Sequence, residues 1–484
     1  MSTPAPASPT PTIGWRGAAL VVTATAGGGL AIALALNRLG PAALLLAAGV
    51  VVALALVGRP GVVLGLLLVP TVLFEASSGA LPPGGSRLFA PVSGALSPVE
   101  MLFLLLALAV MVGATARREF RLPEPFTVPL LLLVLGIVMG IINGLSNGAS
   151  AADIRDALRL ILYLVLVPFA MVNVLRTRTA VLFVEYAAAA LAVVKSALGV
   201  GGLALGYGIA ITGGVLTYYE PTANWLAMTF LLGVLIALLA RVRLPLWAYG
   251  GGALALLSLV LSFRRSFWIG TVIAILIVVL VGSGRVGRRY ILVGAVTVVL
   301  AVWLSLNVAT ELQGPGAAKR QSANLVVERI QSLDPAKLSQ NAEDRYRIDE
   351  RNNVLDEISA HPFFGIGLGV PWAAPHPLSV EHDRRYVHFT ALWYWLRMGI
   401  LGVAAYAWIM IAGMLSGLRL WRRAEDDRLR IAGLAMFGGL VGLAVAETTA
   451  TFTGVDQRFT IVIAAALGWL SAAQRYVKPK PKPG

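Results

Sequence analysis

Residues that could do chemistry are concentrated in one polar stretch of this chain, residues 308–387. It contains 11 of the 24 acidic residues and three of the four histidines, His361, His376 and His382, while the fourth, His388, follows its last residue. A positioned histidine can accept a proton from a hydroxyl near neutral pH. The three histidines within the stretch lack the spacing of metal ligands. We therefore expect a functional site here, without a metal or another cofactor.

Arginines offer a second kind of chemistry. Arg264 and Arg265 are adjacent in a short turn, residues 262–268 (SFRRSFW), between two apolar runs. Two cations at the ends of hydrophobic helices are costly unless they reach water, lipid headgroups or an anionic ligand. The pair is therefore predicted either to extend to phosphate headgroups or to bind an anion.

A helix is expected over residues 343–360, because its side chains recur at spacings of three and four. Two arginines on a packing face would repel each other weakly, so they predict an acidic partner or a bound anion. Glu343, Asp344 and Glu350 are the alternative partners within the helix. The helix should end before Pro362, because proline disfavours a helical residue in front of it. The residues predicted to share one face are Arg347, Arg351, Val354, Leu355 and Ile358.

Two further features close the polar stretch. The glycine-rich segment 363–369 (FFGIGLG) has the wrong spacing and context for a dinucleotide-binding loop, so we expect a flexible turn that returns toward the membrane. His388 opens the next apolar run. It is either a hydrogen-bonded residue at the membrane surface or a group that accepts a proton.

The elements that must position these residues are membrane helices. The chain is 58% hydrophobic and only 13% charged, with a mean hydropathy of +0.80, and apolar runs of about 20 residues recur along it, enough to cross a bilayer. We therefore predict an all-α polytopic membrane protein with about 12–14 transmembrane helices. The absence of cysteine excludes disulfides, iron–sulfur clusters and thiol catalysis. The predicted spans are 17–36, 40–57, 60–74, 97–115, 126–145, 157–175, 180–198, 222–240, 244–262, 266–283, 289–307, 388–416, 430–448 and 457–473.

Charge in the connections predicts which side each one occupies. Alternate connections are basic, and the others are nearly free of lysine and arginine, as expected when basic loops stay in the cytoplasm. This pattern places the polar stretch outside the cytoplasm and both termini inside. It also accounts for the net charge of +15 without nucleic-acid binding. The basic connections are Arg59, 117–121, 176–178, 241–243, 285–289 and 419–430.

The predicted organisation follows from these spans. Membrane lipids are expected partners, since the basic tail can touch anionic headgroups. The predicted parts are a disordered cytoplasmic N-terminus (1–16), a transmembrane bundle of about 11 helices (17–307), an extracytoplasmic loop (308–387), C-terminal transmembrane helices (388–473) and a basic cytoplasmic tail (474–484).

Several of these segments together resemble the O-antigen ligase and polymerase family of membrane glycosyltransferases. The turn SFRRSFWIG (262–270) is similar to the SFSRGAWLG-like turn of that family. Arg347, fifteen residues before Pro362, and the HPFFGIGLG segment (361–369) look like its loop arginine and its HPllGvGlG motif. His388, which precedes the run LRMGILG (396–402), looks like the family's histidine at the start of a span.

The resemblance covers roughly residues 215–410, in which Tyr219–Asn224 is similar, more weakly, to the family's start of an upstream helix. The sequence departs from the pattern at three positions. Phe389 replaces a usual asparagine, Arg397 a frequent glutamate and Arg351 a frequent tryptophan. The first could change the orientation of the histidine, and the other two the acceptor site.

The resemblance implies a function and a set of roles. A glycan would be transferred from an undecaprenyl (polyprenyl) diphosphate carrier to an acceptor hydroxyl on the outer face of the bacterial inner membrane. The acceptor could be a glycan, a lipid or a protein. The reaction would be inverting and metal-independent, on a GT-C-type helical fold. Arg265 and Arg347 would hold the diphosphate and His388 would orient or deprotonate the hydroxyl. Further candidates for substrate binding are Arg264, Arg351, Arg385, Tyr386, Asn224 and Lys195.

Two other functions stay open. A transporter of lipid-linked glycans could use the same arginines without chemistry, but it should carry charged residues along a path through its spans. The membrane interior is nearly uncharged apart from four residues toward its outer half, which favours an outward-facing site: Arg159, Lys195, Arg397 and Glu447. A relative of peptidoglycan polymerases would rely on a loop carboxylate such as Asp349 or Glu357. Ligase and polymerase activity are not distinguished by the sequence.

Overall fold

The computed structural model describes most of the predicted membrane region. The predicted spans 17–36 and 289–307, nearly all of 40–57 and the first part of the polar stretch lie outside the described residues. The predicted disorder of residues 1–16 also lies outside them. The described residues are 55–74, 86–90, 96–206, 209–210, 216–217, 220–282, 342–378 and 383–477.

Helices dominate the described residues. Eight of them are long and apolar enough to cross a membrane, and α3 and α10 are shorter apolar helices, which confirms an all-α polytopic membrane protein. A two-residue antiparallel pair, β1 (Ile209–Ala210) and β2 (Leu216–Thr217), and a 3₁₀ turn at Gln474–Tyr476 are minor additions. The helices are α3 (Pro60–Leu73), α4 (Ser86–Phe89), α5 (Pro98–Arg117), α6 (Thr127–Ser146), α7 (Ala151–Val174), α8 (Arg178–Ala204), α9 (Pro221–Leu239), α10 (Leu246–Leu261), α11 (Arg265–Gly282), α14 (Ala342–Ala360), α15 (Thr390–Arg423), α16 (Asp427–Ala446) and α17 (Gln457–Ala473).

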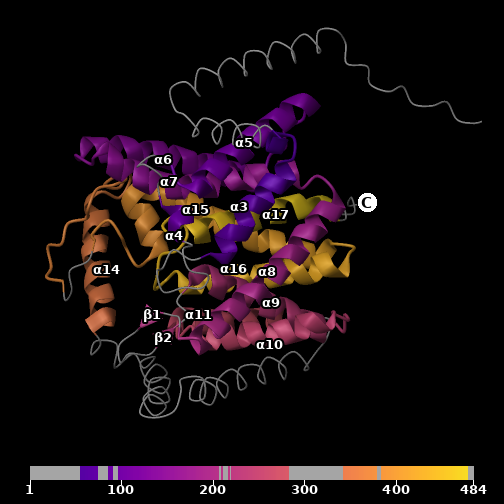
Figure 1. The fold of residues 1–484 in the computed structure, drawn as a ribbon. Coiled ribbons are helices and arrows are strands. Elements are labelled where there is room, and N and C mark those ends of the chain that lie inside the picture. The colour runs from indigo at the N-terminus through magenta and orange to yellow at the C-terminus, as the bar shows by residue number, and fades with distance from the viewer. Residues whose placement is uncertain are drawn as a thin grey trace, which may run out of the picture.

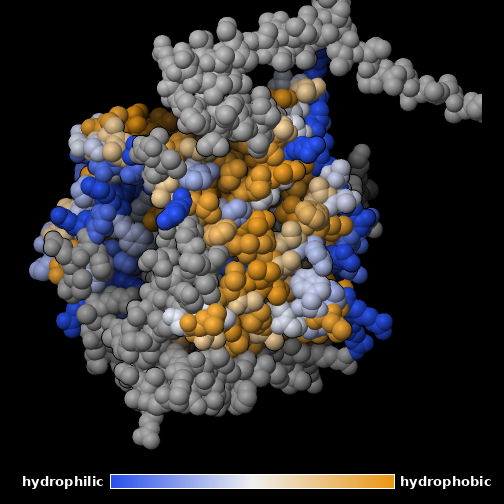
Figure 2. Space-filling model, in the orientation of Figure 1, coloured by the Kyte–Doolittle hydropathy of each residue, from blue (hydrophilic) through white to orange (hydrophobic). Residues whose placement is uncertain are grey.

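The apolar helices run side by side, and α14 lies across one end of them (Figure 1). Figure 2 shows polar residues along two opposite edges of the visible face, with apolar surface between them. Large apolar side chains of the membrane helices are exposed, for example Leu131 of α6 (59% exposed) and Leu280 of α11 (72% exposed). An apolar exterior of this kind suits contact with lipid tails rather than water.

Local sequence explains where several helices begin. Ser97 and Glu100 form a capping box at the start of α5, in which each side chain accepts a hydrogen bond from the other residue's backbone N–H. The Asp456 side chain caps α17 by accepting from the N–H of Phe459, at 2.9 Å. Pro221 occupies the first turn of α9, where a missing N–H costs nothing.

The helices α15 and α16 pack against each other, α6 packs against α15, α11 and α9 pack against α16, and α17 packs mainly against α7. Small residues permit this packing where helices meet closely. A Cβ atom added to Gly270 of α11 would lie 2.4 Å from the carbonyl oxygen of Gly442 on α16. Such contacts let helix backbones approach each other in a bilayer, where the hydrophobic effect gives little drive for association.

The helix α15 is interrupted at Gly399, whose φ of 64° lies in the left-handed region. The glycine-rich segment 363–369 fills the interruption. The N–H of Ile366 donates to the carbonyl of Leu396 at 2.8 Å, and the N–H of Ile400 donates to the carbonyl of Phe363 at 3.2 Å. The break in α15 therefore provides backbone hydrogen-bond partners for the non-helical segment 363–369.

The other side of the segment is held by α6. The N–H of Leu368 donates to the carbonyl of Gly140 at 2.8 Å, and the Asn143 side chain donates to the carbonyl of Phe364 at 2.9 Å. Gly367, with φ of 102°, lies so close to α6 that an added Cβ would be 2.1 Å from the nitrogen of Gly144. The segment thus returns to the apolar helices α6 and α15. The predicted flexible turn is wrong, because the segment is hydrogen-bonded on both sides.

Candidate active site

The helix α14 confirms the helix expected in the polar stretch, and Val354 and Ile358 lie on its packing face as predicted. Arg351 is exposed and Leu355 is 38% exposed, so the prediction that both share the packing face is wrong. Arg347 is half-buried. The helix docks through acidic and aromatic side chains because the bundle offers basic partners to them. The buried residues of α14 are Asp344, Tyr346, Glu350, Asn353, Val354 and Ile358.

The first contact between α14 and the bundle is an ion pair. Arg265 opens α11, and one of its terminal nitrogens donates to both carboxylate oxygens of Asp344, at 2.7 and 3.0 Å. Both side chains are largely buried, with 13% and 8% exposed. A charge-assisted contact of this kind fixes the guanidinium at the end of the bundle.

The second contact joins α14 to the start of α15. The carboxylate of Glu350, which is fully buried, accepts from the backbone N–H of His388 at 2.9 Å and lies 2.9 Å from its Nδ1. A carboxylate next to Nδ1 favours the proton on that nitrogen and leaves Nε2 as the basic nitrogen of a neutral ring. The hydroxyl of Tyr346 also donates to Glu350, at 3.3 Å.

Tyr386 packs beside the histidine. Its ring meets the His388 ring edge to face at 4.7 Å, and its hydroxyl donates to the carbonyl of Thr451 at 3.2 Å. Burial raises the pKa of Tyr386, while the positive charges of Arg264 and Arg347 act in the opposite direction. Both arginines are thus close enough to this phenol to act on its charge. The phenol stays neutral at neutral pH.

Arg264 faces the same region, with its guanidinium 5.7 Å from the centre of the Phe452 ring. On α14, Arg347 lies three residues after Asp344 and three before Glu350. Those two acids are about 9 Å apart along the axis at 1.5 Å per residue. We name this group of residues the α14 site; it comprises Arg264, Arg265, Asp344, Arg347, Glu350, Tyr386 and His388.

Lys195 belongs to a different cluster, buried among the bundle helices. Its ammonium lies 3.0 Å from a carboxylate oxygen of Glu220, just before α9, and donates to the carbonyl of Leu73 at 3.1 Å. The other oxygen of Glu220 lies 3.3 Å from the guanidinium of Arg458 on α17. Lys195 and Glu220 are each only 1% exposed at the side chain. The structure therefore places Lys195 among the bundle helices, and its role in substrate binding stays a prediction.

The remaining predicted residues are dispersed. Arg385 is half-exposed and pairs with Asp153 of α7 at 3.0 Å. Asn224 is fully buried in the first turn of α9, and its side chain has no hydrogen-bond partner among the described residues. Arg351 points outward from α14. Their roles in substrate binding stay predictions.

Arg397, which departs from the family pattern, holds the backbone of the polar stretch. Its guanidinium is buried within α15 and donates to the carbonyls of Val370 and Arg385, the latter at 2.6 Å. These contacts fix the segments that lead from α14 to His388. Arg397 thus supports the site without being part of it.

The loop histidines other than His388 lie elsewhere. His376 contacts Asp356 at 3.1 Å and His361 lies 3.8 Å from Glu357, both near the surface, while His382 lies outside the described residues. The described residues contain no group of three or more acidic residues and histidines that could hold a metal ion.

Two residues of the α14 site were not identified as such from the sequence. Asp344 and Glu350 were expected, at most, as partners for Arg347 and Arg351. They also contact Arg265 and His388, 79 and 38 residues away. Only their six-residue spacing within one helix could have hinted at a shared role.

The match to known proteins falls on the same residues. Residues 250–407 match the sequence model of a family described as O-antigen ligase. That segment begins in α10, ends in α15 and contains the whole α14 site. No curated protein was found to match the chain. The match supports a role in ligating or polymerising surface polysaccharide, and with the apolar helices it indicates a multi-pass protein of the inner membrane. Over residues 250–407 the chain is thus similar to the O-antigen ligase family.

Proposed function

We propose that this protein transfers a glycan from a polyprenyl diphosphate carrier to an acceptor hydroxyl at the α14 site. One observation carries the proposal. A single loop helix, α14, contacts both the arginine turn and the histidine, through Asp344 to Arg265 and through Glu350 to His388. Cations for a diphosphate and a base for a hydroxyl thereby lie at the same end of the bundle.

The arginines would act on the leaving group. In a single displacement, the acceptor oxygen forms a bond to the anomeric carbon while the bond from that carbon to the phosphate oxygen breaks, which inverts the configuration. The electron pair of the broken bond leaves with the diphosphate. Arg265 and Arg347 would stabilise the added charge, with Arg264 nearby. Fixed cations in a water-poor site suit this task without a metal ion.

The histidine would act on the nucleophile. With its Nδ1 proton directed to Glu350, His388 can accept the hydroxyl proton of the acceptor at Nε2. Glu350 would then stabilise the imidazolium that forms, as buried carboxylates do in catalytic triads. His388 is 20% exposed at the side chain, so the ring is accessible to a substrate. Glu350 is a positioning residue in this scheme.

The two alternatives are less well supported. Charged residues toward the outer half of the predicted spans have local partners, as in the contacts of Arg397 with loop carbonyls and of Glu447 with Tyr406 and the N–H of Thr453. Charges that are paired in this way are less suited to carry a substrate across the bundle. For a polymerase that depends on a loop carboxylate, Glu357 accepts from the N–H of Ala373 and holds the loop. Glu350 is the carboxylate that adjoins the histidine.

The proposal is tested with purified protein in detergent, where no membrane separates two compartments. The protein receives a polyprenyl-diphosphate-linked oligosaccharide of one anomeric configuration, a hydroxyl-bearing acceptor and EDTA. We expect a glycoside of the opposite anomeric configuration, measured by nuclear magnetic resonance, and release of polyprenyl diphosphate.

A transporter would give no product in detergent, and a metal-dependent transferase would stop in EDTA. A product with retained configuration would contradict the single displacement. Comparison of reactions with and without a separate acceptor also distinguishes a ligase from a polymerase, because a polymerase extends the donor glycan itself.

A further inference from the structure

A second site lies at the end of the bundle opposite α14, between α5, α6 and α7. An apolar cavity of about 310 Å³ opens there on the outer surface of the bundle. Its lining includes Met111 of α5 and Leu131 of α6, which are 58% and 59% exposed, and Phe120 just beyond α5. Ala107 also lines it. The cavity is therefore an open groove on the outer surface of the helix bundle.

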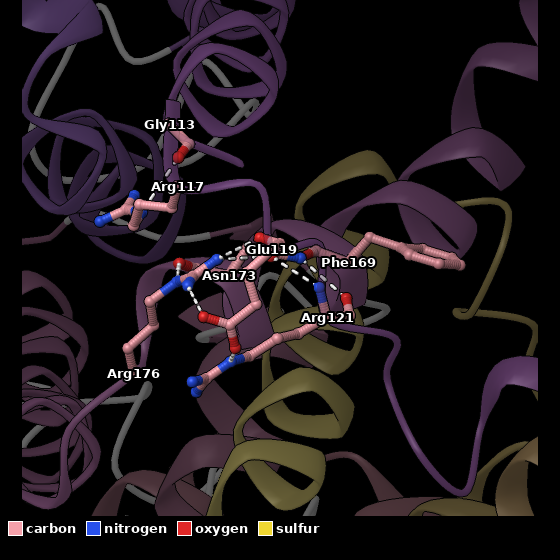
Figure 3. Close-up of polar contacts among 7 residues, drawn as sticks. All are labelled: Gly113, Arg117, Glu119, Arg121, Phe169, Asn173 and Arg176. Atoms are coloured by element: carbon pink, nitrogen blue, oxygen red, sulfur yellow. Dashed lines mark hydrogen bonds and ion pairs between the residues drawn. The ribbon is translucent and has the colours of Figure 1, made fainter. Parts of the chain in front are cut away.

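Phe120 ties this groove to a group of arginines. Its ring stacks on that of Phe169, which also lines the groove, with centroids 6.2 Å apart. The side chain of Asn173, one turn further along α7, donates to the carbonyl of Phe169 and, at 2.8 Å, to that of Arg121 (Figure 3). Arg176 donates to the Asn173 side-chain oxygen at 3.1 Å. The same short network thus forms one wall of the groove and holds two arginines at its end.

Positive charge exceeds negative charge in this group. Arg117, Arg118, Arg121 and Arg176 contribute four cations, and Glu119 is the acidic residue that pairs with them, at 2.5 Å from Arg121 and 2.9 Å from Arg176. Burial lowers the pKa of Arg176, and the nearby charges of Arg117 and Arg121 lower it further. Arg117 and Arg118 are exposed, and the Nε of Arg117 donates to the carbonyl of Gly113 on its own helix.

A ligand that satisfies both features has a negative headgroup and a long apolar chain. We propose that the α5–α6–α7 groove binds an anionic glycerophospholipid, with one acyl chain against Met111, Phe120 and Leu131 and the phosphate near Arg117 and Arg118. Basic residues next to a bilayer surface attract anionic headgroups, and the volume of the groove is at the low end of ligand pockets, about 300–1,000 Å³. It admits part of one chain while the rest of the lipid stays in the bilayer.

The site is independent of the reaction proposed for α14. It lies on other helices, and its arginines belong to connections on the opposite side of the predicted topology. Its expected effect is to anchor α5, α6 and α7 in a membrane that contains anionic lipid. The helix α6 also binds the glycine-rich segment 363–369. A lipid that holds α6 in place would therefore stabilise this segment, which follows α14, without taking part in the reaction.

The test is lipid binding to the full-length purified protein in a neutral detergent. Native mass spectrometry measures the apparent dissociation constant of phosphatidylglycerol, with phosphatidylcholine as the neutral comparison. We expect tighter binding of phosphatidylglycerol. The double variant Arg117→Gln/Arg118→Gln should weaken it about tenfold or more, at roughly 1 kcal/mol per basic residue. Ala107→Phe, which fills the groove, should weaken it as well.

The matched control is Arg241→Gln/Arg243→Gln, which removes two exposed arginines from the α9–α10 connection, away from α5 and α6 (Figure 1). It should leave phosphatidylglycerol binding unchanged. Equal binding of both lipids, equal losses in the two double variants, or full binding by Ala107→Phe would overturn the proposal. Displacement of phosphatidylglycerol by a polyprenyl phosphate at lower concentration would assign the groove to the isoprenoid chain instead.

Discussion

Two charged clusters lie at the α14 end of the bundle, and they differ in where their acids come from. Around Lys195, all the charges belong to the bundle helices and the segments that start them, and the lysine is 1% exposed at its side chain. At the α14 site, the acids come from a loop helix, and His388 is 20% exposed. The first cluster joins helices to each other. The second joins a loop helix to the bundle and leaves His388 accessible. A substrate can therefore reach the second cluster.

Removal of Lys195 should produce the largest effect on the fold. Lys195→Met leaves Glu220 buried with Arg458 alone, and loss of one partner from a buried ion pair costs about 3–5 kcal/mol. We expect a lower free energy of unfolding in detergent, with activity lost only in proportion to unfolded protein. Arg155→Met, which breaks an exposed pair with Asp156, is the control. Normal stability together with weakened donor binding would instead show that Lys195 binds the substrate.

The arginines of the α14 site should affect the rate. Arg265→Ala and Arg347→Ala are each expected to raise the barrier of glycosyl transfer by about 2–4 kcal/mol, the usual loss for one charge-stabilising donor. Steady-state kinetics with a polyprenyl-diphosphate donor measure this change. Unaltered kcat/KM in both variants would show that the diphosphate does not bind at this site.

Glu350 should have a smaller effect, and on a different kinetic constant. Glu350→Gln removes a charge-assisted hydrogen bond to His388, worth about 1.5–3 kcal/mol, so kcat should fall roughly tenfold to a hundredfold while KM for the donor stays similar. Glu357→Gln is the matched control on the same helix. An increase in KM without a change in kcat would show that Glu350 only docks α14.

Arg351 should have the smallest effect. Because its side chain is exposed on α14, Arg351→Ala is expected to change the barrier and the free energy of unfolding by less than about 0.5 kcal/mol. The same assays used for Arg347→Ala measure both. A loss as large as that of Arg347→Ala would mean that the acceptor contacts the exposed face of α14.

Much of the fold follows from the sequence, because hydrophobic length and local caps are short-range properties. The predicted span 97–115 corresponds to α5 (Pro98–Arg117), and 457–473 is α17 itself. The end of α14 before Pro362 was also predictable from proline. What the spans do not reveal is the packing between them, such as the break at Gly399 that receives the glycine-rich segment.

The site was predictable in its basic residues but not in their partners. The turn around Arg265 and the position of His388 stand out because charges at the ends of apolar runs are rare. Their pairing with Asp344 and Glu350 depends on how α14 lies across the bundle, which no local pattern encodes. For the same reason, periodicity placed Arg351 on the packing face. A helix face that carries acidic residues can be buried when the residues packed against it are basic.

The central claim is that His388 accepts the proton of the acceptor hydroxyl in a metal-independent transfer. The most direct measurement is a single-turnover reaction in EDTA, with protein in excess over a defined polyprenyl-diphosphate glycan, for the wild type, His388→Ala and His376→Ala. Mass spectrometry follows the glycosylated acceptor. The account predicts product for the wild type and His376→Ala, and a rate lower by about 10²–10⁴-fold for His388→Ala. An unchanged rate in His388→Ala would contradict it.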